Sequence, residues 1–194
     1  SAFGFKAGKV FLLGLQDQGF AGSIHLVHPH AAEIDGLPCR PSLGDIPGPV
    51  DMVIILSPRE TVDAVLDACA EKRVKIVVLY TSGYAESGDA EGRREQERLR
   101  EKARRGGFRI LGPNCMGVYS PAAGLAAFPG MPRTTGPVGF LSQSGSLSNL
   151  LTNACAPRGV FFRHAVSYGN GSDLDLPELL RSEERRVGKE CIVK

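Results

Sequence analysis

The sequence has few of the features that mark exported, membrane-bound or nucleic-acid-binding proteins. Its formal net charge is only +2 over 194 residues, which is too small to predict a nucleic acid or a membrane surface as a partner. No apolar run approaches the roughly 18–20 residues that span a bilayer. The opening residues also do not have the pattern of a signal peptide. We therefore expect a cytoplasmic protein.

Cysteine is scarce and scattered. The 5 cysteines are widely spaced and never form a CxxC pair, so the sequence predicts neither a disulfide framework nor a zinc site. No histidine has a spacing to cysteine or carboxylate that indicates metal binding. We expect reduced thiols and no metal site.

Short apolar runs alternate with candidate helices in the first part of the chain. The runs lie at 24–27, 52–56, 76–80 and 108–111, and the helices at 8–18, 59–72 and 90–105. Within the second helix, one apolar stripe is formed by Val62, Val65, Leu66 and Cys69. The alternation predicts a parallel sheet with right-handed crossovers. Ligands of such sheets bind beyond the carboxyl ends of the strands.

The composition changes after the fourth run. Residues 112–137 are rich in Gly and Pro, and strands at 138–141 and 161–166 then alternate with helices at 146–154 and 174–180. We predict a first domain at 1–120, a linker at 121–137 and an incomplete second α/β domain at 138–181. The charged residues 182–194 resemble translated adapter or vector sequence, so we expect a non-native tail.

The segment before the first helix is a candidate phosphate cradle. It contains Ser1, Lys6 and Gly8, and a helix N-terminus with a nearby cation favours bound anions. The glycine fingerprint is incomplete and the expected first strand of the sheet is missing. A helix cap at a frayed terminus explains the same residues.

Polar or small residues follow each of the four predicted strands. These tips are His28-Pro29-His30, Ser57-Pro58-Arg59, Thr81-Ser82-Gly83-Tyr84 and Gly112-Pro113-Asn114-Cys115. Any single tip has an ordinary loop composition. Four such tips along one edge of a sheet favour a nucleotide-like ligand that carries phosphates.

A second candidate site joins a strand to a helix in the second domain. It comprises Ser142, Gln143, Ser144, Gly145 and Ser146. Hydroxyl groups and a glycine at a helix N-terminus form an anion site, but Ser144 or Gly145 alone also suits a helix N-cap. Both interpretations stay open. Residues 167–173 form another polar tip beside this segment.

Read in order, these segments resemble the α subunit of succinyl-CoA synthetase and, more closely, the acetate–CoA ligase (ADP-forming) family. The segments that carry the resemblance are VDMVIILSPRE, VLYTSGYAE, ILGPNCMGV, GFLSQSGSL and VSYGNGSDLD. The resemblance covers about residues 1–181, and GPNC followed by SQSG is its most specific part. The family commonly has Asn-Pro-Lys where this chain has His28-Pro29-His30.

The resemblance implies a Rossmann-like CoA-binding domain followed by a truncated flavodoxin-like α/β domain. It places CoA contacts on Ser1, Lys6, Gly8, Ser57, Pro58, Thr81, Ser82, Gly83 and Asn114. It also implies that the helix after SQSG faces a phosphorylated histidine. The implied reaction converts acyl-CoA, ADP and phosphate into a small carboxylic acid, CoA and ATP.

The family's phosphohistidine lies beyond the part of this chain that resembles it. None of the 4 histidines occupies that place. The ATP-grasp part, which binds ADP or ATP and Mg²⁺, is also missing, so we expect it as a partner domain or subunit. We expect this chain alone to be inactive and the complete protein to be an oligomer.

Two other functions remain open at this point. One is a non-catalytic or regulatory CoA-binding module, fused in some relatives to a protein acetyltransferase. The other is an NAD(P) oxidoreductase, although His28-Pro29-His30 lacks the acidic residue that holds a ribose after the second strand.

Overall fold

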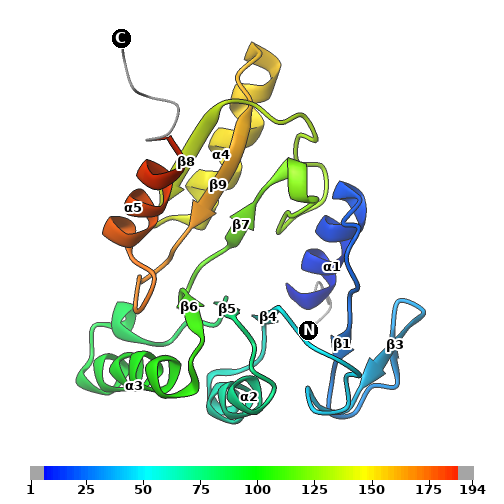
Figure 1. Cartoon of the computed structure of the whole chain (residues 1–194), viewed down its shortest axis with the longest axis vertical. Helices are drawn as coiled ribbons and strands as arrows, with labels where there is room; N and C mark the ends of the chain where they lie inside the picture. The colour runs from blue at the N-terminus through cyan, green and yellow to red at the C-terminus, as the bar shows by residue number, and fades with distance from the viewer. Residues whose placement is uncertain (1–6, 188–194) are drawn as a thin grey trace.

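The computed structural model describes residues 7–187, which form two α/β units that follow one another along the chain (Figure 1). The elements of the first unit are α1 (Ala7–Gln18), β1 (Leu26–Val27), β2 (Glu33–Ile34), β3 (Leu37–Arg40), β4 (Met52–Ile55), α2 (Arg59–Glu71), β5 (Ile76–Leu79), η1 (Ala85–Ser87), α3 (Ala90–Gly106) and β6 (Arg109–Leu111). Those of the second are β7 (Gly117–Tyr119), η2 (Pro121–Ala123), β8 (Val138–Ser142), α4 (Gly145–Cys155), η3 (Ala156–Arg158), β9 (Phe162–Ser167) and α5 (Leu176–Val187).

The first unit is built on the parallel sheet β4–β5–β6. Its core contains Leu66 of α2, Val77 of the central strand β5 and Ile110 of β6, each 0% exposed. Unbroken apolar strands of this kind are buried on both faces. The predicted helices and the predicted parallel sheet are confirmed in this unit.

A separate small sheet contains β1, β3 and β2, in that order. β1 runs parallel to β3, and β2 and β3 form a hairpin. At its turn Asp35 has φ 51° and Gly36 has φ 77°, which are the left-handed conformations of a tight hairpin turn. The sequence analysis did not predict this hairpin, although an Asp-Gly pair is typical of one.

The second unit is built on the sheet β7–β9–β8, in which β8 and β9 are parallel and β7 is antiparallel to β9. β7 comes directly after the first sheet in the chain and pairs through Gly117 with Ser167 at the end of β9. The Gly/Pro-rich residues before β8 therefore contribute a strand to the second sheet as well as a connection.

The connection between the two units packs against α1. The Gln18 Nε2 donates to the Met131 carbonyl at 2.8 Å, and the Asp17 carboxylate accepts from Gly130 N at 2.7 Å and Arg133 at 2.9 Å. The Gly130 N–H, followed by Arg133, lowers the pKa of Asp17 below its ordinary value. These bonds hold the connection in place.

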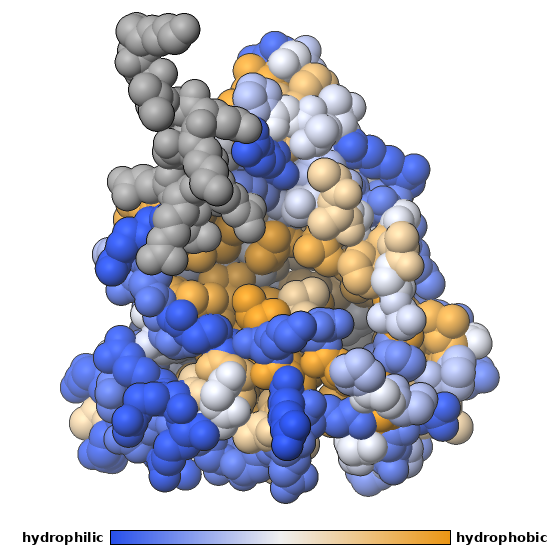
Figure 2. Space-filling model, viewed as in Figure 1, coloured by the Kyte–Doolittle hydropathy of each residue, from blue (hydrophilic) through white to orange (hydrophobic). Residues whose placement is uncertain are grey.

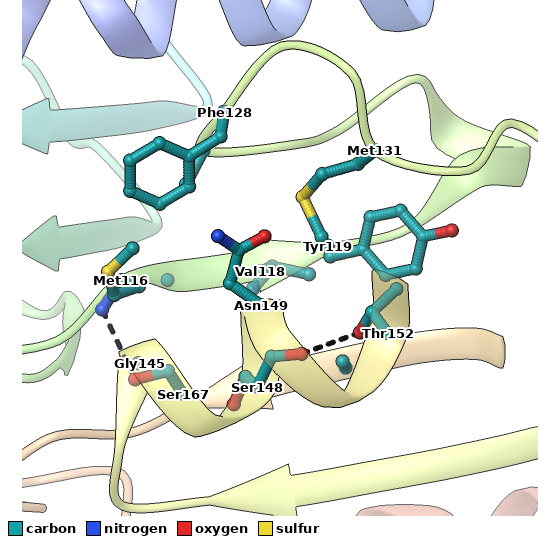
Figure 3. Close-up of a pocket in the computed structure, with 13 residues that line it drawn as sticks. Met116, Val118, Tyr119, Phe128, Met131, Gly145, Ser148, Asn149, Thr152 and Ser167 are labelled. Atoms are coloured by element: carbon teal, nitrogen blue, oxygen red, sulfur yellow. Dashed lines mark hydrogen bonds between the residues drawn. The ribbon is translucent and has the colours of Figure 1, made fainter. Parts of the chain in front are cut away.

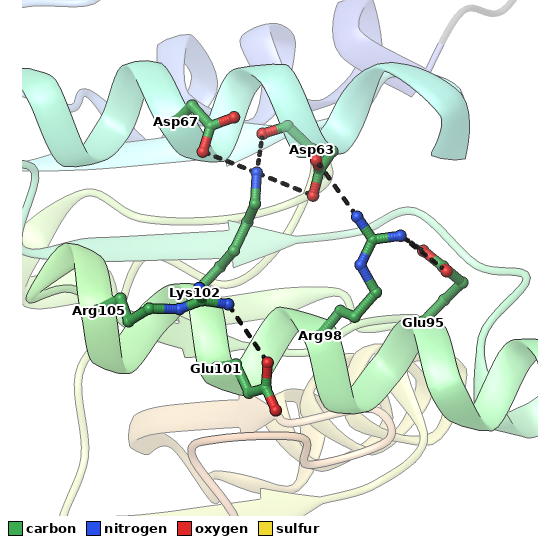
Figure 4. Close-up of polar contacts among 7 residues, drawn as sticks. All are labelled: Asp63, Asp67, Glu95, Arg98, Glu101, Lys102 and Arg105. Carbon is green, nitrogen blue, oxygen red and sulfur yellow. Dashed lines mark hydrogen bonds and ion pairs between the residues drawn. The ribbon is translucent and has the colours of Figure 1, made fainter.

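Ion pairs join α2 to α3 on the outer side of the first unit (Figure 4). Lys102 reaches from α3 to α2, where its Nζ lies 2.9 Å from an Asp63 carboxylate oxygen and 2.7 Å from one of Asp67. Its side chain is only 18% exposed. Arg105 instead pairs with Glu101 of its own helix at 3.3 Å, and both are well exposed.

The surface of the first unit differs from that of the middle of the molecule. Figure 2 shows hydrophilic residues over α2 and α3, and hydrophobic residues gathered across the middle of the same face. The helices within residues 7–187 include none with the length and apolar character that a membrane crossing requires.

Candidate functional site

The tips of the first sheet are tied to one another by hydrogen bonds. The Thr81 hydroxyl donates to the Ser57 carbonyl at 2.7 Å, and Asn114 N donates to the Thr81 carbonyl at 3.0 Å. The carboxyl ends of β4, β5 and β6 therefore form one continuous edge, as predicted. The Thr81 hydroxyl helps to build this edge, whereas Ser82 and Asn114 are exposed on it.

The tip His28-Pro29-His30 is not joined to this edge by strand pairing. Because β1 pairs with β3 and no strand within residues 7–187 joins it to β4, its place along the same edge stays a prediction. The His28–His30 turn is closed on itself, since the His28 Nδ1 accepts from His30 N and Ala31 N at 3.2 and 2.9 Å.

The start of α1 lies near the β4 tip. A Cβ at Gly8 would have Leu56 Cδ1 as its nearest neighbour, 4.0 Å away, and Leu56 directly precedes Ser57. The predicted cradle thus begins beside the Ser57-Pro58-Arg59 tip. Ser1 and Lys6 lie outside the described residues, so their contribution stays a prediction.

The second unit meets the first at the edge of β6. Asn170 N donates to the Pro113 carbonyl at 2.9 Å, Ser172 N to Gly112 at 3.0 Å, and Leu174 N to Ile110 at 3.0 Å. The segment after β9 therefore runs along the β6 edge and its tip. The last residue of β9, Ser167, pairs with Gly117, which closely follows the β6 tip in the chain. The carboxyl end of β9 therefore lies beside the tips of the first sheet.

The start of α4 belongs to the same region. Tyr168 N donates to the Ser142 carbonyl at 3.0 Å, which joins the β8 tip to the β9 tip. Ser144 is the N-cap of α4, and its Oγ accepts from Leu147 N at 3.2 Å. The N-cap interpretation is confirmed, while the anion site stays a prediction. The two interpretations are compatible, since the other N–H groups of a first helical turn have no partner inside the helix.

A small cleft lies under α4, beside the tips (Figure 3). Met116 and Gly145 line its end nearest the tips, and Phe128, Met131 and Asn149 are turned toward one another across it. Its free volume of about 20 Å³ holds little more than one water-sized group. A nucleotide-sized ligand does not fit this cleft.

Two groups hold the turn after β5 in ways that the sequence did not predict, although Arg59 belongs to a predicted tip. Glu86 accepts from Gly83 N at 2.6 Å and from Tyr84 N at 3.2 Å, so its carboxylate closes the turn after β5. Arg59 Nη1 donates to the Gly83 carbonyl at 2.7 Å from the other side. Carboxylates and cations in loops are common on any surface, so the single sequence carries no signal for these roles.

The donor set at the edge suits a polar or anionic ligand. Exposed hydroxyl and amide groups lie on Ser82 and Asn114, and the start of α1 supplies backbone N–H groups. Gly83 has φ 97°, and a Cβ there would meet nothing closer than 3.6 Å, so ligand atoms have room at this turn. Within residues 7–187, no three His, Cys, Asp or Glu side chains are grouped as a metal site.

Fold and site together define an α/β nucleotide-type binding domain whose ligand edge faces a second α/β unit. The chain belongs to the CoA binding domain family, whose sequence model matches residues 5–121. The model of the succinyl-CoA ligase-like flavodoxin domain matches residues 135–193. The Rossmann-like and flavodoxin-like fold expected from the resemblance is thus confirmed.

Known relatives carry the same two domains. The chain is 38% identical over 159 residues, 82% of its length, to the α subunit of acetate–CoA ligase (ADP-forming) II of Pyrococcus furiosus, of which it covers 35%. It matches the dinucleotide-forming acetyl-coenzyme A synthetase 1 of Ca. Korarchaeum cryptofilum, solved with phosphate and ADP, with TM-score 0.85 and 35% identity over 95% of this chain and 39% of that one. A 17% identical ATP citrate lyase of Methanothrix soehngenii, with TM-score 0.67 over 93% of this chain and 33% of that one, shares the fold.

The resemblance to ADP-forming acetate–CoA ligases is therefore confirmed, and this chain corresponds to their CoA-binding part. It spans only 35% of the length of the first of these relatives and 39% of the second.

Proposed function

We propose that the protein to which this chain belongs is an ADP-forming acid–CoA ligase, in which this part binds CoA. The reaction interconverts acyl-CoA, ADP and phosphate with a small carboxylic acid, CoA and ATP. The observation that carries the proposal is the meeting of two tip regions. The tips at Ser57, Thr81 and Asn114 form one edge, and the segment after β9 joins that edge to the start of α4.

The residues of the first edge have separate tasks in this proposal. The start of α1, with Ser1, Lys6 and Gly8, stabilises the phosphates of CoA through N–H groups and a cation. The Ser57-Pro58 and Thr81–Gly83 turns orient the rest of the ligand, and Asn114 lies near its thiol. When bound, CoA supplies the thiol that takes or releases the acyl group.

The start of α4 stabilises the charge of a transferred phosphoryl group. Ser144 caps one N–H group of the first turn, which leaves the N–H groups of the residues before Leu147 and the helix dipole to face an anion. In this proposal a phosphohistidine outside this chain approaches Ser142–Ser146, and an ATP-grasp domain or subunit holds the nucleotide and Mg²⁺. We also propose that the complete protein is cytoplasmic and oligomeric.

The test is isothermal titration of the chain with CoA and, separately, with NAD⁺ and NADP⁺. We expect CoA to bind and the dinucleotides not to bind. Ser82→Tyr fills the exposed edge after β5, so it should weaken CoA binding at least tenfold. Arg94→Tyr changes an exposed residue of α3 outside the tips and should leave the Kd unchanged.

Dinucleotide binding without a response to CoA would overturn the proposal in favour of an oxidoreductase. CoA binding by a complete protein that forms no ATP from acyl-CoA, ADP and phosphate would leave a regulatory CoA-binding module instead.

A further inference from the structure

The turn after β5 is held by a carboxylate that also contacts the second unit. Glu86 Oε1 accepts from Gly83 N at 2.6 Å and Glu86 Oε2 accepts from Tyr84 N at 3.2 Å. The same Oε2 accepts a hydrogen bond from Asn170 Nδ2, which lies in the segment after β9. One side chain therefore joins a predicted CoA-binding turn to the other α/β unit.

Asn170 is itself held at three points. Its Nδ2 also donates to Gln96 Oε1 at 2.8 Å, and its backbone N donates to the Pro113 carbonyl at 2.9 Å. Gln96 Oε1 accepts from Ala85 N as well, at 3.3 Å, so this amide also braces the residues before Glu86. Asn170 thus sits over the tips of both β5 and β6 and cannot move without disturbing them.

The contact continues to the start of α4. Two residues before Asn170, Tyr168 N donates to the Ser142 carbonyl at 3.0 Å, and the Ser142 Oγ accepts from Ser144 N at 3.1 Å. Gly169, between them, lies against Pro113 and Asn114 so closely that a Cβ would be 2.1 Å from the Pro113 carbonyl oxygen. A continuous set of contacts therefore runs from Gly83 to the α4 N-terminus.

The charge of Glu86 suits this role. Burial acts to raise its pKa, but the hydrogen bonds from Asn170, Gly83 and Tyr84 outweigh burial and hold the pKa below its ordinary value. The side chain is an acceptor at neutral pH, and each of its bonds is charge-assisted and therefore stronger than a bond between neutral groups.

We infer that Glu86 and Asn170 are positioning residues that couple the CoA-binding turn at Gly83 to the segment that carries Ser142–Ser146. Binding of CoA at the turn then orders the segment after β9 and, through it, the start of α4. Conversely, loosening of the segment after β9 weakens CoA binding. This inference rests on the proposed function, in which the turn binds CoA.

The test is a cycle of isosteric variants measured by titration with CoA. Asn170→Asp places a second carboxylate against Glu86, and repulsion together with the lost bond should raise the Kd roughly tenfold or more. Glu86→Gln loses the charge and should raise it roughly three- to tenfold. In the double variant Glu86→Gln/Asn170→Asp the new amide can donate to the new carboxylate, whereas Gln96 Oε1 stays without its donor, so the Kd should fall clearly below that of Asn170→Asp alone.

Glu95→Gln is the matched control, because it changes a carboxylate of α3 whose hydrogen bonds go to Arg98. It should leave the Kd within about twofold. Hydrogen exchange gives the second readout: CoA should slow exchange in 81–84 and also in 142–147 and 168–173 of the wild type. In Asn170→Asp the protection of 142–147 and 168–173 should be lost at saturating CoA.

The outcomes separate the inference from the proposed function. If the wild type binds no CoA, both are overturned. If it binds CoA but the double variant is no better than Asn170→Asp alone, or if CoA leaves exchange in 168–173 unchanged, only the coupling is overturned. Recovery of both affinity and protection in the double variant would support the coupling, because it would show that the two side chains act as a pair on both readouts.

Discussion

Two glycines, Gly169 and Gly171, lie in the tip after β9. Of these, Gly169 approaches the first α/β unit more closely. A Cβ at this position would lie 2.1 Å from the Pro113 carbonyl oxygen and 2.6 Å from that of Asn114. The Pro113 carbonyl cannot simply move away, because it accepts from Asn170 N, and its peptide group is also held by Asn114 N, which donates to the Thr81 carbonyl. Gly169→Ala should therefore separate the two units or distort the tips.

The size of the effect follows from two costs. Gly169 has φ 57°, and an L-residue in this left-handed conformation costs about 1 kcal/mol. The clash with held backbone adds roughly 1–3 kcal/mol, as for overpacking of a core. We expect a loss of about 3 kcal/mol in the free energy of unfolding, and a fall in Tm of roughly 6–12 °C for a chain of this length.

Gly171→Ala is the matched control in the same segment. Gly171 has φ 63°, but the nearest atom to its added Cβ, Tyr168 Cδ2, is 3.4 Å away, an ordinary contact distance. Only the backbone cost applies, so the loss should be about 1 kcal/mol and the fall in Tm roughly 2–4 °C. Urea and thermal unfolding followed by circular dichroism measure both. Equal losses in the two variants would refute the close approach at Gly169.

Three other results are expected. Lys102→Met removes the ion pairs from α3 to α2 and should lower the free energy of unfolding in urea by about 1–2 kcal/mol. Arg105→Gln changes an exposed pair and should lower it by less than about 0.5 kcal/mol. Similar losses in the two variants would contradict this reasoning. Burial raises the pKa of Cys69 and of Cys115 to about 12. After alkylation of the folded protein at pH 8, peptide mass spectrometry should therefore find both thiols unmodified, while the half-buried Cys39 and Cys155 react. Rapid labelling of Cys69 or Cys115 would count against their burial. Asp89 caps α3, and a hydrogen bond from a backbone N–H of the first turn lowers the pKa of Asp89. The stability that the ionised cap adds to the fold is therefore complete above the unfolded-state pKa of about 4. It is lost as the pH falls through the lower folded-state pKa. Asp89→Ala should then lower Tm at pH 7 by more than at pH 2.5, and a deficit independent of pH would argue against the ionised cap.

The local pattern of the sequence was enough to predict the helices and the parallel strands. The stripe on α2 has the period of a helix that faces a sheet, and the short unbroken apolar run at Met52–Ile55 is typical of a buried strand. The tips followed from the same reasoning, because polar residues after parallel strands meet at one edge. The chain order of those tips also carried the family resemblance.

Other features depend on which backbone edges meet in space. The short strand β7 has no recognisable period, and it is a strand because β9, far along the chain, offers it a partner. β1 has the apolar character of a sheet strand, yet its partner is β3 of the hairpin. A pattern reports which face of a strand is buried, but it does not report which strand lies beside it.

The sequence by itself therefore determined the kind of elements, their order and the residues available at the tips, because these depend on the period and chemistry of neighbouring residues. Only the tertiary structure decided that Thr81 serves the edge with its hydroxyl and that Glu86 meets Asn170. Hydrogen bonds between residues 84 positions apart form only after both backbones are placed to within a few tenths of an ångström, and no local pattern encodes that placement.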